Sequence, residues 1–232
     1  RLLVLVLYPF VKMSEFLTRT MTEGPTISGF SRQEFAAMAE LSAEEGELGR
    51  QESRVVRNLL ALRHTPVHAA MTPRTVLFTL PDSTTVDEFF HRYEQQPFSR
   101  IPIYDNDDGD RITGFVLRGD LLLAQARGNQ SNLLENYRRD MPSVPETLTL
   151  GRAFNRAQQT RAHMMLVVDE YGDMQGILTL EDIIETLLGL EIVDESDATI
   201  DMQDLARRKW RRRARQMGLD MQEVSKTKFT GD

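Results

Sequence analysis

The sequence contains no cysteine among its 232 residues. This absence excludes a disulfide framework, a thiolate metal site and a cysteine nucleophile. The chain also lacks a Gly-x-Ser-x-Gly elbow, a P-loop lysine and a His-Glu-x-x-His motif. We therefore predict no catalytic residue and no enzymatic activity. We also predict no protein metal site, because the histidines do not have the spacing of metal ligands: His64, His68, His91 and His163.

Long apolar runs are scarce as well. Residues 2–11 (LLVLVLYPFV) are shorter than the roughly 20 apolar residues that span a bilayer, and they lack the small-residue cleavage site of a signal peptide. Two interpretations stay open: a buried or surface-packed helix, or the tail of a transmembrane segment cut by a fragment boundary. Pro9, with Tyr8 and Phe10 beside it, favours an exit at the membrane interface.

The charge balance limits the partners. Hydrophobic residues make up 41% of the chain and charged residues 27%, as is typical of a soluble globular protein. The net charge of −7 argues against nucleic acid as a partner of the folded part. Residues 206–216 (ARRKWRRRARQ) are the exception, with seven basic side chains. As a functional signal they predict a membrane-surface or nucleic-acid patch, and we favour an anionic membrane surface as the partner. The alternative is a solvated helix or a disordered tail without a specific partner.

An internal repeat organises the middle of the chain. Residues 86–105 align with residues 150–169 at an offset of 64, and each copy has the pattern of an amphipathic helix, a short apolar strand and an aspartate. Each copy continues through a polar turn into a glycine-led strand and an apolar helix. A repeated unit of about 60 residues has too few apolar faces to stand alone. We expect two units to bury a shared core and to form a ligand cleft between their sheets.

The segment 176–182 (GILTLED) carries the clearest functional signal. Gly176 lets the backbone approach a ligand, and the hydroxyl of Thr179 and the first amides of a following helix can face phosphate. The carboxylate of Asp182, one helical turn later, can accept two hydrogen bonds from ribose. The alternative is purely structural: a threonine cap and an acidic residue in a first helical turn. In the first repeat, Leu117 replaces the hydroxyl while Asp120 remains, so we expect two unequal clefts and a nucleotide only in that of Thr179.

The repeated pattern resembles tandem CBS domains, whose loose signature is glycine, two apolar residues, Thr or Ser, two more residues and Asp. It is more closely similar to the cytosolic part of the CorC/CNNM family of magnesium transporters, also called hemolysin-like proteins. Five phrases in the order of that family carry the resemblance: residues 71–75 (MTPRT), 99–104 (SRIPIY), 163–172 (HMMLVVDEYG), 176–186 (GILTLEDIIET) and 191–197 (EIVDESD).

The resemblance implies an α+β fold, in which a tandem CBS (Bateman) module forms a pseudo-two-fold pair of β-sheets flanked by helices. We divide the chain into five parts: the end of a membrane or juxtamembrane segment at 1–29, a helical linker at 30–66, CBS repeat 1 at 67–130, CBS repeat 2 at 131–198 and a basic tail at 199–232.

Within the linker, Ser31 and Glu34 predict the start of a helix over 31–46, and apolar spacing predicts another over 50–62. Residues 71–80 are predicted to form a strand that leads into repeat 1. Residues 141–150 are expected to do the same for repeat 2.

The resemblance adds residues from the first repeat to the site of Thr179 and Asp182. A guanidinium at a strand entry, that of Arg100, can hold polyphosphate in a bidentate manner, although a surface salt bridge is the alternative. We expect the remaining site residues to offer an aromatic face, apolar walls, hydroxyls or backbone contacts: Phe98, Ser99, Pro102, Thr72 and Thr75. For Phe98 the alternative is a core aromatic residue.

The resemblance also implies a function. We expect ATP with Mg²⁺ as a regulatory ligand, a homodimer, and coupling to the protein's own transmembrane domain. The region would then lie on the cytoplasmic side of the inner (plasma) membrane and control transport of magnesium, and cobalt as a second candidate ion. The alternative is a ligand-free CBS scaffold that dimerises and docks on a membrane or a partner protein.

Overall fold

The computed structural model describes residues 31–107, 111–190 and 208–209. The chain divides into two compact units, residues 1–60 and residues 61–232. The first unit contains α2 (Arg32–Glu44) and most of α3 (Arg50–Ala61). Both predicted helices are therefore confirmed. The predicted start of α2 is confirmed in detail, because the Ser31 hydroxyl accepts the Glu34 amide and the Glu34 carboxylate accepts the Ser31 amide.

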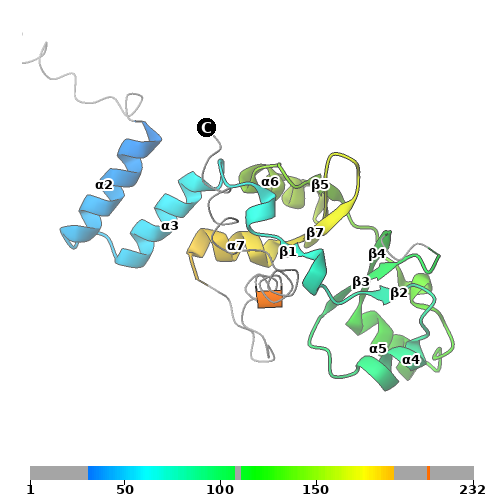
Figure 1. Cartoon of the computed structure of the whole chain (residues 1–232). Helices are drawn as coiled ribbons and strands as arrows, with labels where there is room; N and C mark the ends of the chain where they lie inside the picture. Colours follow the sequence, from blue (N-terminus) through cyan, green and yellow to red (C-terminus); the bar gives the residue numbers. More distant parts are fainter. Residues whose placement is uncertain (1–30, 108–110, 191–207, 210–232) are drawn as a thin grey trace, which may run out of the picture. The chain divides into compact units, whose positions relative to one another are not determined.

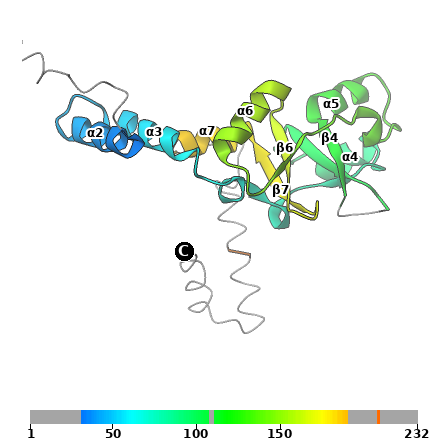
Figure 2. The ribbon, with the colours of Figure 1, turned by 90° about the horizontal axis from the view of Figure 1, so that it is seen from above.

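The second unit contains both repeats (Figures 1 and 2). The elements of repeat 1 are η2 (Val67–Ala69), β1 (Thr72–Pro73), η3 (Arg74–Val76), β2 (Leu80–Pro81), α4 (Val86–Tyr93), β3 (Arg100–Tyr104), β4 (Ile112–Leu117) and α5 (Arg118–Ala126). Those of repeat 2 are η4 (Leu134–Tyr137), β5 (Ser143–Pro145), α6 (Leu150–Thr160), β6 (Met164–Val168), β7 (Met174–Thr179) and α7 (Leu180–Leu188).

These strands form two sheets, in the orders β1-β7-β6-β5 and β2-β3-β4. Each sheet is built around an antiparallel hairpin, β6 with β7 or β3 with β4, to which a short parallel strand is added. Figure 1 shows α6 and α7 beside the first sheet and α4 and α5 beside the second. The predicted α+β fold with two helix-flanked sheets is confirmed.

The two repeats match in backbone detail. The register of each hairpin shifts at the same place, between Ile103 and Tyr104 in repeat 1 and between Val167 and Val168 in repeat 2. At the junction of strand and helix, the Arg118 amide donates to the carbonyl of Ser99, and the Leu180 amide donates to that of His163, both at 3.0 Å. The pseudo-two-fold relation inferred from the sequence therefore extends to individual hydrogen bonds.

The expectation of one shared core is wrong, because the buried apolar side chains form two clusters. One cluster packs α6 and α7 on the sheet of repeat 2, and its members include Val144, Leu150, Ala153, Met165, Val167, Leu178 and Ile183. The other packs α4 and α5 on the sheet of repeat 1, and its members include Leu80, Val86, Phe89, Ile101, Ile103, Val116 and Leu121. Each sheet has its own helices, so each half encloses its own apolar side chains.

The first residues of each repeat pack into the core that the sheet and helices of the other repeat form. Val67 opens repeat 1 but is fully buried in the cluster of repeat 2, where its amide donates to the carbonyl of Leu148 at 2.8 Å. Leu134 opens repeat 2 but is fully buried in the cluster of repeat 1, where its amide donates to Thr84 at 2.9 Å. The two halves are thus joined by a reciprocal exchange of short segments.

This exchange explains why the strand predicted over 71–80 is wrong. That segment contains two short strands separated by η3, and they belong to different sheets: β1 pairs with β7, and β2 pairs with β3. A chain that crosses from one sheet to the other cannot remain one strand. Over 141–150, only β5 is extended, and α6 begins at Leu150.

Other predictions are not tested by the described residues. No helix in the described ranges is both long enough and apolar enough to cross a bilayer. The predicted juxtamembrane segment at 1–29 and the acidic stretch at 191–197 lie outside the described residues. So does the basic tail, apart from residues 208 and 209.

Candidate functional site

The start of α7 is built by a reciprocal pair of hydrogen bonds. Thr179 is the N-cap, and its hydroxyl accepts the Asp182 amide at 3.1 Å. The Asp182 carboxylate accepts the Thr179 amide at 2.7 Å in return. This capping box satisfies two of the amides that a helix leaves without a partner at its N-terminus. It also fixes a hydroxyl and a carboxylate side by side where β7 ends.

The surroundings of Asp182 change its ionisation. Burial raises the pKa of this carboxyl from 3.8 to about 7, and the hydrogen bonds from Thr179 oppose that change without cancelling it. The nearby charges of Glu185 and Glu181 raise the pKa further. Asp182 keeps part of its surface exposed, so the carboxyl is surrounded by protein yet remains in reach of a ligand. Near neutral pH it is present in both ionisation states.

Arg100 brings the first repeat to this helix start. Its guanidinium lies 3.8 Å from the carboxylate of Glu181, the residue before Asp182. The Arg100 side chain is 28% exposed, whereas that of Glu181 is 61% exposed. A pair at this distance on an open surface is weak. A phosphate group can therefore replace Glu181 as the partner of Arg100.

Two further predicted threonines, Thr72 and Thr75, lie in elements that neighbour β7. Thr72 is in β1, which pairs antiparallel with β7 so that Thr72 is opposite Ile177 and Pro73 is opposite Gly176. The approach is so close that a Cβ added at Gly176 would lie 2.4 Å from the Thr72 carbonyl oxygen. Thr75 is exposed in η3, an element that contacts β7. Gly176 is thus required by the backbone of β1.

The other predicted residues border Arg100. Pro102 is buried, and alternation along β3 puts it on the face of Arg100, opposite to Ile101 and Ile103 in the core. Ser99 is exposed, and its carbonyl is occupied by the Arg118 amide.

The remaining predicted residue, Phe98, is half-buried at the edge of the repeat-1 cluster. Its ring stacks on Phe78, with centroids 6.0 Å apart. One face of Phe98 is therefore covered by the protein itself. We call the group that the strands and helices bring around β7 and α7 the repeat-2 site: Thr72, Thr75, Arg100, Thr179 and Asp182.

The corresponding position in repeat 1 is arranged differently. Leu117 is the N-cap of α5 and provides no side-chain hydrogen bond. The Asp120 carboxylate accepts two hydrogen bonds from Arg139, at 2.8 Å from Nη2 and 3.1 Å from Nε. Sequence reasoning missed both Arg139 and Glu181. Arg139 lies outside the aligned parts of the repeat, and a backbone bridge to Phe115 brings it to Asp120. For Glu181 a signal was available, because it directly precedes the predicted residue Asp182.

Comparison with known proteins identifies the fold family. A CBS domain model matches residues 67–127 and 134–189. The chain belongs to the CBS domain family. It is 32% identical over 219 residues to UPF0053 protein sll1254 of Synechocystis, covering 94% of this chain and 63% of the length of that relative. It is 28% identical over 204 residues to the magnesium and cobalt efflux protein CorC of Escherichia coli, covering 87% of this chain and 69% of that protein.

Solved structures agree with this family. The CBS domain of a bacterial CNNM/CorC family Mg²⁺ transporter superposes with a TM-score of 0.65 at 30% identity, covering 71% of this chain and 99% of that one. A structure of such a domain in complex with ATP superposes with a TM-score of 0.57 at 30% identity, covering 60% of this chain and 99% of that one. The resemblance to the CorC/CNNM family is confirmed: this CBS pair is of the CorC/CNNM type.

Proposed function

We propose that this CBS pair is the nucleotide-sensing region of a membrane magnesium transporter, with cobalt as a second candidate ion. Mg-ATP binds at the repeat-2 site and controls the transmembrane domain. One observation carries the proposal: the Thr179–Asp182 capping box and Arg100, from different repeats, meet at the start of α7. A related CNNM/CorC domain with ATP bound supports the choice of ligand.

Each residue has a distinct role in this proposal. The Asp182 carboxylate has four acceptor positions and uses one for the Thr179 amide, so it retains acceptors for two ribose hydroxyls. The Thr179 hydroxyl can donate its proton to a phosphate. The amides of Thr179, Leu180 and Asp182 are bonded within the protein, so the start of α7 acts on the phosphates through the helix dipole, which favours negative charge. Arg100 leaves Glu181 and holds the phosphates with its planar fork of donors.

The remaining predicted residues shape the site. Phe98 and Pro102 provide apolar contacts for the base, and Ser99, Thr72 and Thr75 provide hydroxyl or backbone contacts. Magnesium arrives bound to the phosphates of ATP, because this ion usually keeps several water ligands and is coordinated by phosphate oxygens together with one or two carboxylates. It lowers the charge of ATP beside Glu181, which explains why binding should depend on magnesium.

Regulation follows from the position of the ligand. A nucleotide at the repeat-2 site contacts β7 and α7 of one half and the start of β3 of the other. It therefore stabilises the arrangement of the two halves that matches it best, by no more than its difference in affinity between the arrangements. We propose that homodimers of the pair, on the cytoplasmic side of the plasma membrane, transmit this arrangement to a membrane domain through the helical linker.

Calorimetric titration of ATP into the purified chain, with and without magnesium, tests the proposal. We expect Arg100→Ala to weaken magnesium-dependent binding about tenfold to hundredfold, because a charge-assisted contact is lost. Thr179→Val should weaken it about threefold to tenfold. Incubation with ATP should release no ADP, because the site has no residue placed to activate a water.

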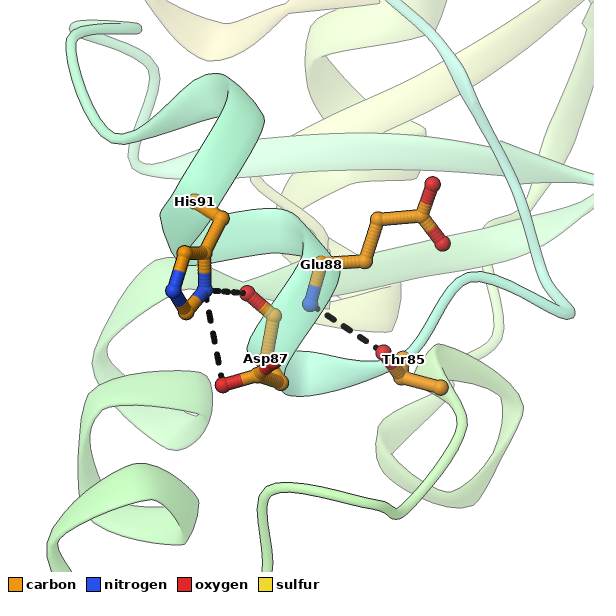
Figure 3. A network of polar contacts seen from close by, with 4 residues as sticks. All are labelled: Thr85, Asp87, Glu88 and His91. Atoms are coloured by element: carbon orange, nitrogen blue, oxygen red, sulfur yellow. Dashed lines mark hydrogen bonds and ion pairs between the residues drawn. The ribbon is translucent and has the colours of Figure 1, made fainter.

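The chain offers matched controls for both variants. Thr85 caps α4 as Thr179 caps α7, and its hydroxyl accepts the Glu88 amide at the same 3.1 Å (Figure 3). Thr85→Val should cost about 1 kcal/mol of stability, as Thr179→Val does, and leave ATP binding unchanged. Arg92→Ala removes an exposed arginine that pairs with Glu88, away from the site. Equal loss of binding in test and control variants would contradict the proposal.

The alternative function is a CBS scaffold without ligand control. Absence of binding by ATP, ADP and AMP in a folded wild-type chain would favour it. The two half-exposed leucines of α5, Leu122 and Leu123, are then the first surface to test for contact with a second copy, by measuring the mass of the chain in solution before and after their replacement.

A further inference from the structure

The carboxylate of Asp120 occupies the same place in repeat 1 as Asp182 does in repeat 2, but its partner is different. Among the residues that the structure describes, the Asp182 carboxylate has its hydrogen-bond donor within its own helix start, the Thr179 amide. Asp120 accepts two from Arg139, a residue that precedes β5 in repeat 2. Both hydrogen bonds from Arg139 go to Oδ2, so its guanidinium lies against one oxygen of the Asp120 carboxylate, at the place where a ribose would bind, whereas the described residues place no such cation on Asp182.

Backbone pairing explains why Arg139 is there. Arg139 exchanges two hydrogen bonds with Phe115, at 2.8 and 3.0 Å, as a strand neighbour of β4. A Cβ added at Gly114 would lie 2.5 Å from the Arg139 carbonyl oxygen, just as one at Gly176 would lie 2.4 Å from that of Thr72. Arg139 is thus the pseudo-symmetric counterpart of Thr72. Thr72 carries a short neutral side chain at this place, whereas Arg139 carries a cation that is bound to Asp120.

We infer that Arg139 keeps the repeat-1 position from taking a nucleotide, by holding the carboxylate of Asp120 in place of a ribose. The pair is partly exposed, with 52% of the Arg139 side chain and 34% of the Asp120 side chain in contact with solvent. Its effect is therefore on ligand occupancy, because an exposed pair adds little to stability. This inference rests on the proposed function, because it assumes that the Thr-x-x-Asp frame binds a nucleotide.

The ligand that would fit a vacated repeat-1 position differs from ATP. The repeat offset places Met164 where Arg100 stands in the other repeat, so the guanidinium that we propose for the phosphates of ATP has no counterpart at that place. The helix start of α5 and Asp120 remain for a ribose and a single phosphate. AMP is accordingly the probe for this position.

The experiment counts AMP sites by equilibrium dialysis of the full chain. The variant Leu117→Thr/Arg139→Thr gives repeat 1 the same three side chains as repeat 2, and we expect it to bind one more AMP per chain than the wild type. Leu117→Thr/Arg139→Lys keeps the cation and should gain none. Leu117→Thr/Arg139→Gln serves as a second neutral variant, and the backbone bridge to Phe115 is available to every one of these side chains.

The outcomes separate this inference from the proposed function. If the wild type binds no nucleotide, the proposed function fails, and the gain of a site in the neutral variants still decides the role of Arg139. If folded neutral variants gain no site, the inference is overturned. It is also overturned if the lysine variant gains the same site, because the hydroxyl at position 117 would then be sufficient.

Discussion

Repeat 1 and repeat 2 share the backbone hydrogen bonds of their strand-to-helix junctions and differ in the side chains placed on them. Both junctions bond an amide at the helix start to the residue before the hairpin. The strand before each junction contains a glycine, and a backbone carbonyl from the other repeat lies against it: that of Thr72 at Gly176 and that of Arg139 at Gly114. Yet the side chain of Thr179 bonds to its helix start and that of Leu117 does not, and within the described part of the chain an arginine binds Asp120 and none binds Asp182. A duplicated frame can thus keep its geometry while only one copy keeps ligand-binding chemistry.

The largest expected effect tests the exchange of segments between the halves. Leu134→Ala should lower the free energy of unfolding by about 2–5 kcal/mol, since it removes a fully buried side chain from the repeat-1 cluster. Val67→Ala does the same, on a smaller scale, to the repeat-2 cluster. Native-state hydrogen exchange should report faster opening of β3 and β4 for Leu134→Ala and of β6 and β7 for Val67→Ala. Faster hydrogen exchange in the strands of the mutated residue's own repeat would contradict the exchange of segments between the two halves.

A smaller effect separates the two glycines. Gly176→Ala and Gly114→Ala each force a Cβ against a backbone carbonyl, and we expect each to cost about 1–3 kcal/mol of stability in chemical denaturation. Only Gly176→Ala moves β1, which carries Thr72, so only this variant should also weaken ATP binding. An equal loss of affinity in both variants would show that general loosening, rather than the repeat-2 site, is responsible.

A third effect concerns pH. Because the pKa of Asp182 is raised to about 7, its carboxyl is protonated below that pH and offers fewer acceptors to ribose. ATP affinity should fall by up to about tenfold for each unit below pH 7. Without nucleotide the sign is opposite: between pH 4 and 7 the native state binds a proton that the unfolded state has released, so stability decreases as pH rises.

Titrations of ATP between pH 5.5 and 8, accompanied by denaturation curves, measure both trends. Asp182→Asn should flatten each of them, whereas Asp120→Asn should leave them as in the wild type. A pH dependence that survives in Asp182→Asn would assign it to other groups, including the phosphates of ATP.

Much of the candidate site was predictable from the sequence, for local reasons. The Thr179–Asp182 capping box follows from residues three apart at a helix start, and the Ser31–Glu34 box at α2 follows from the same spacing. The partners that come from elsewhere were not predictable. Arg139 lies 19 residues from Asp120, and Glu181 is brought to Arg100 from the other repeat. No local spacing marks such pairs.

The sequence by itself determined the two repeats, the hairpin and flanking helices of each, and the loss of the hydroxyl at Leu117, because periodicity and caps depend on near neighbours along the chain. The tertiary structure decided which half each opening segment joins, and it decided that Arg139 binds Asp120. Those outcomes depend on pairing between distant strands. There, the close approach of β1 to Gly176 and of Arg139 to Gly114 selects one register among many.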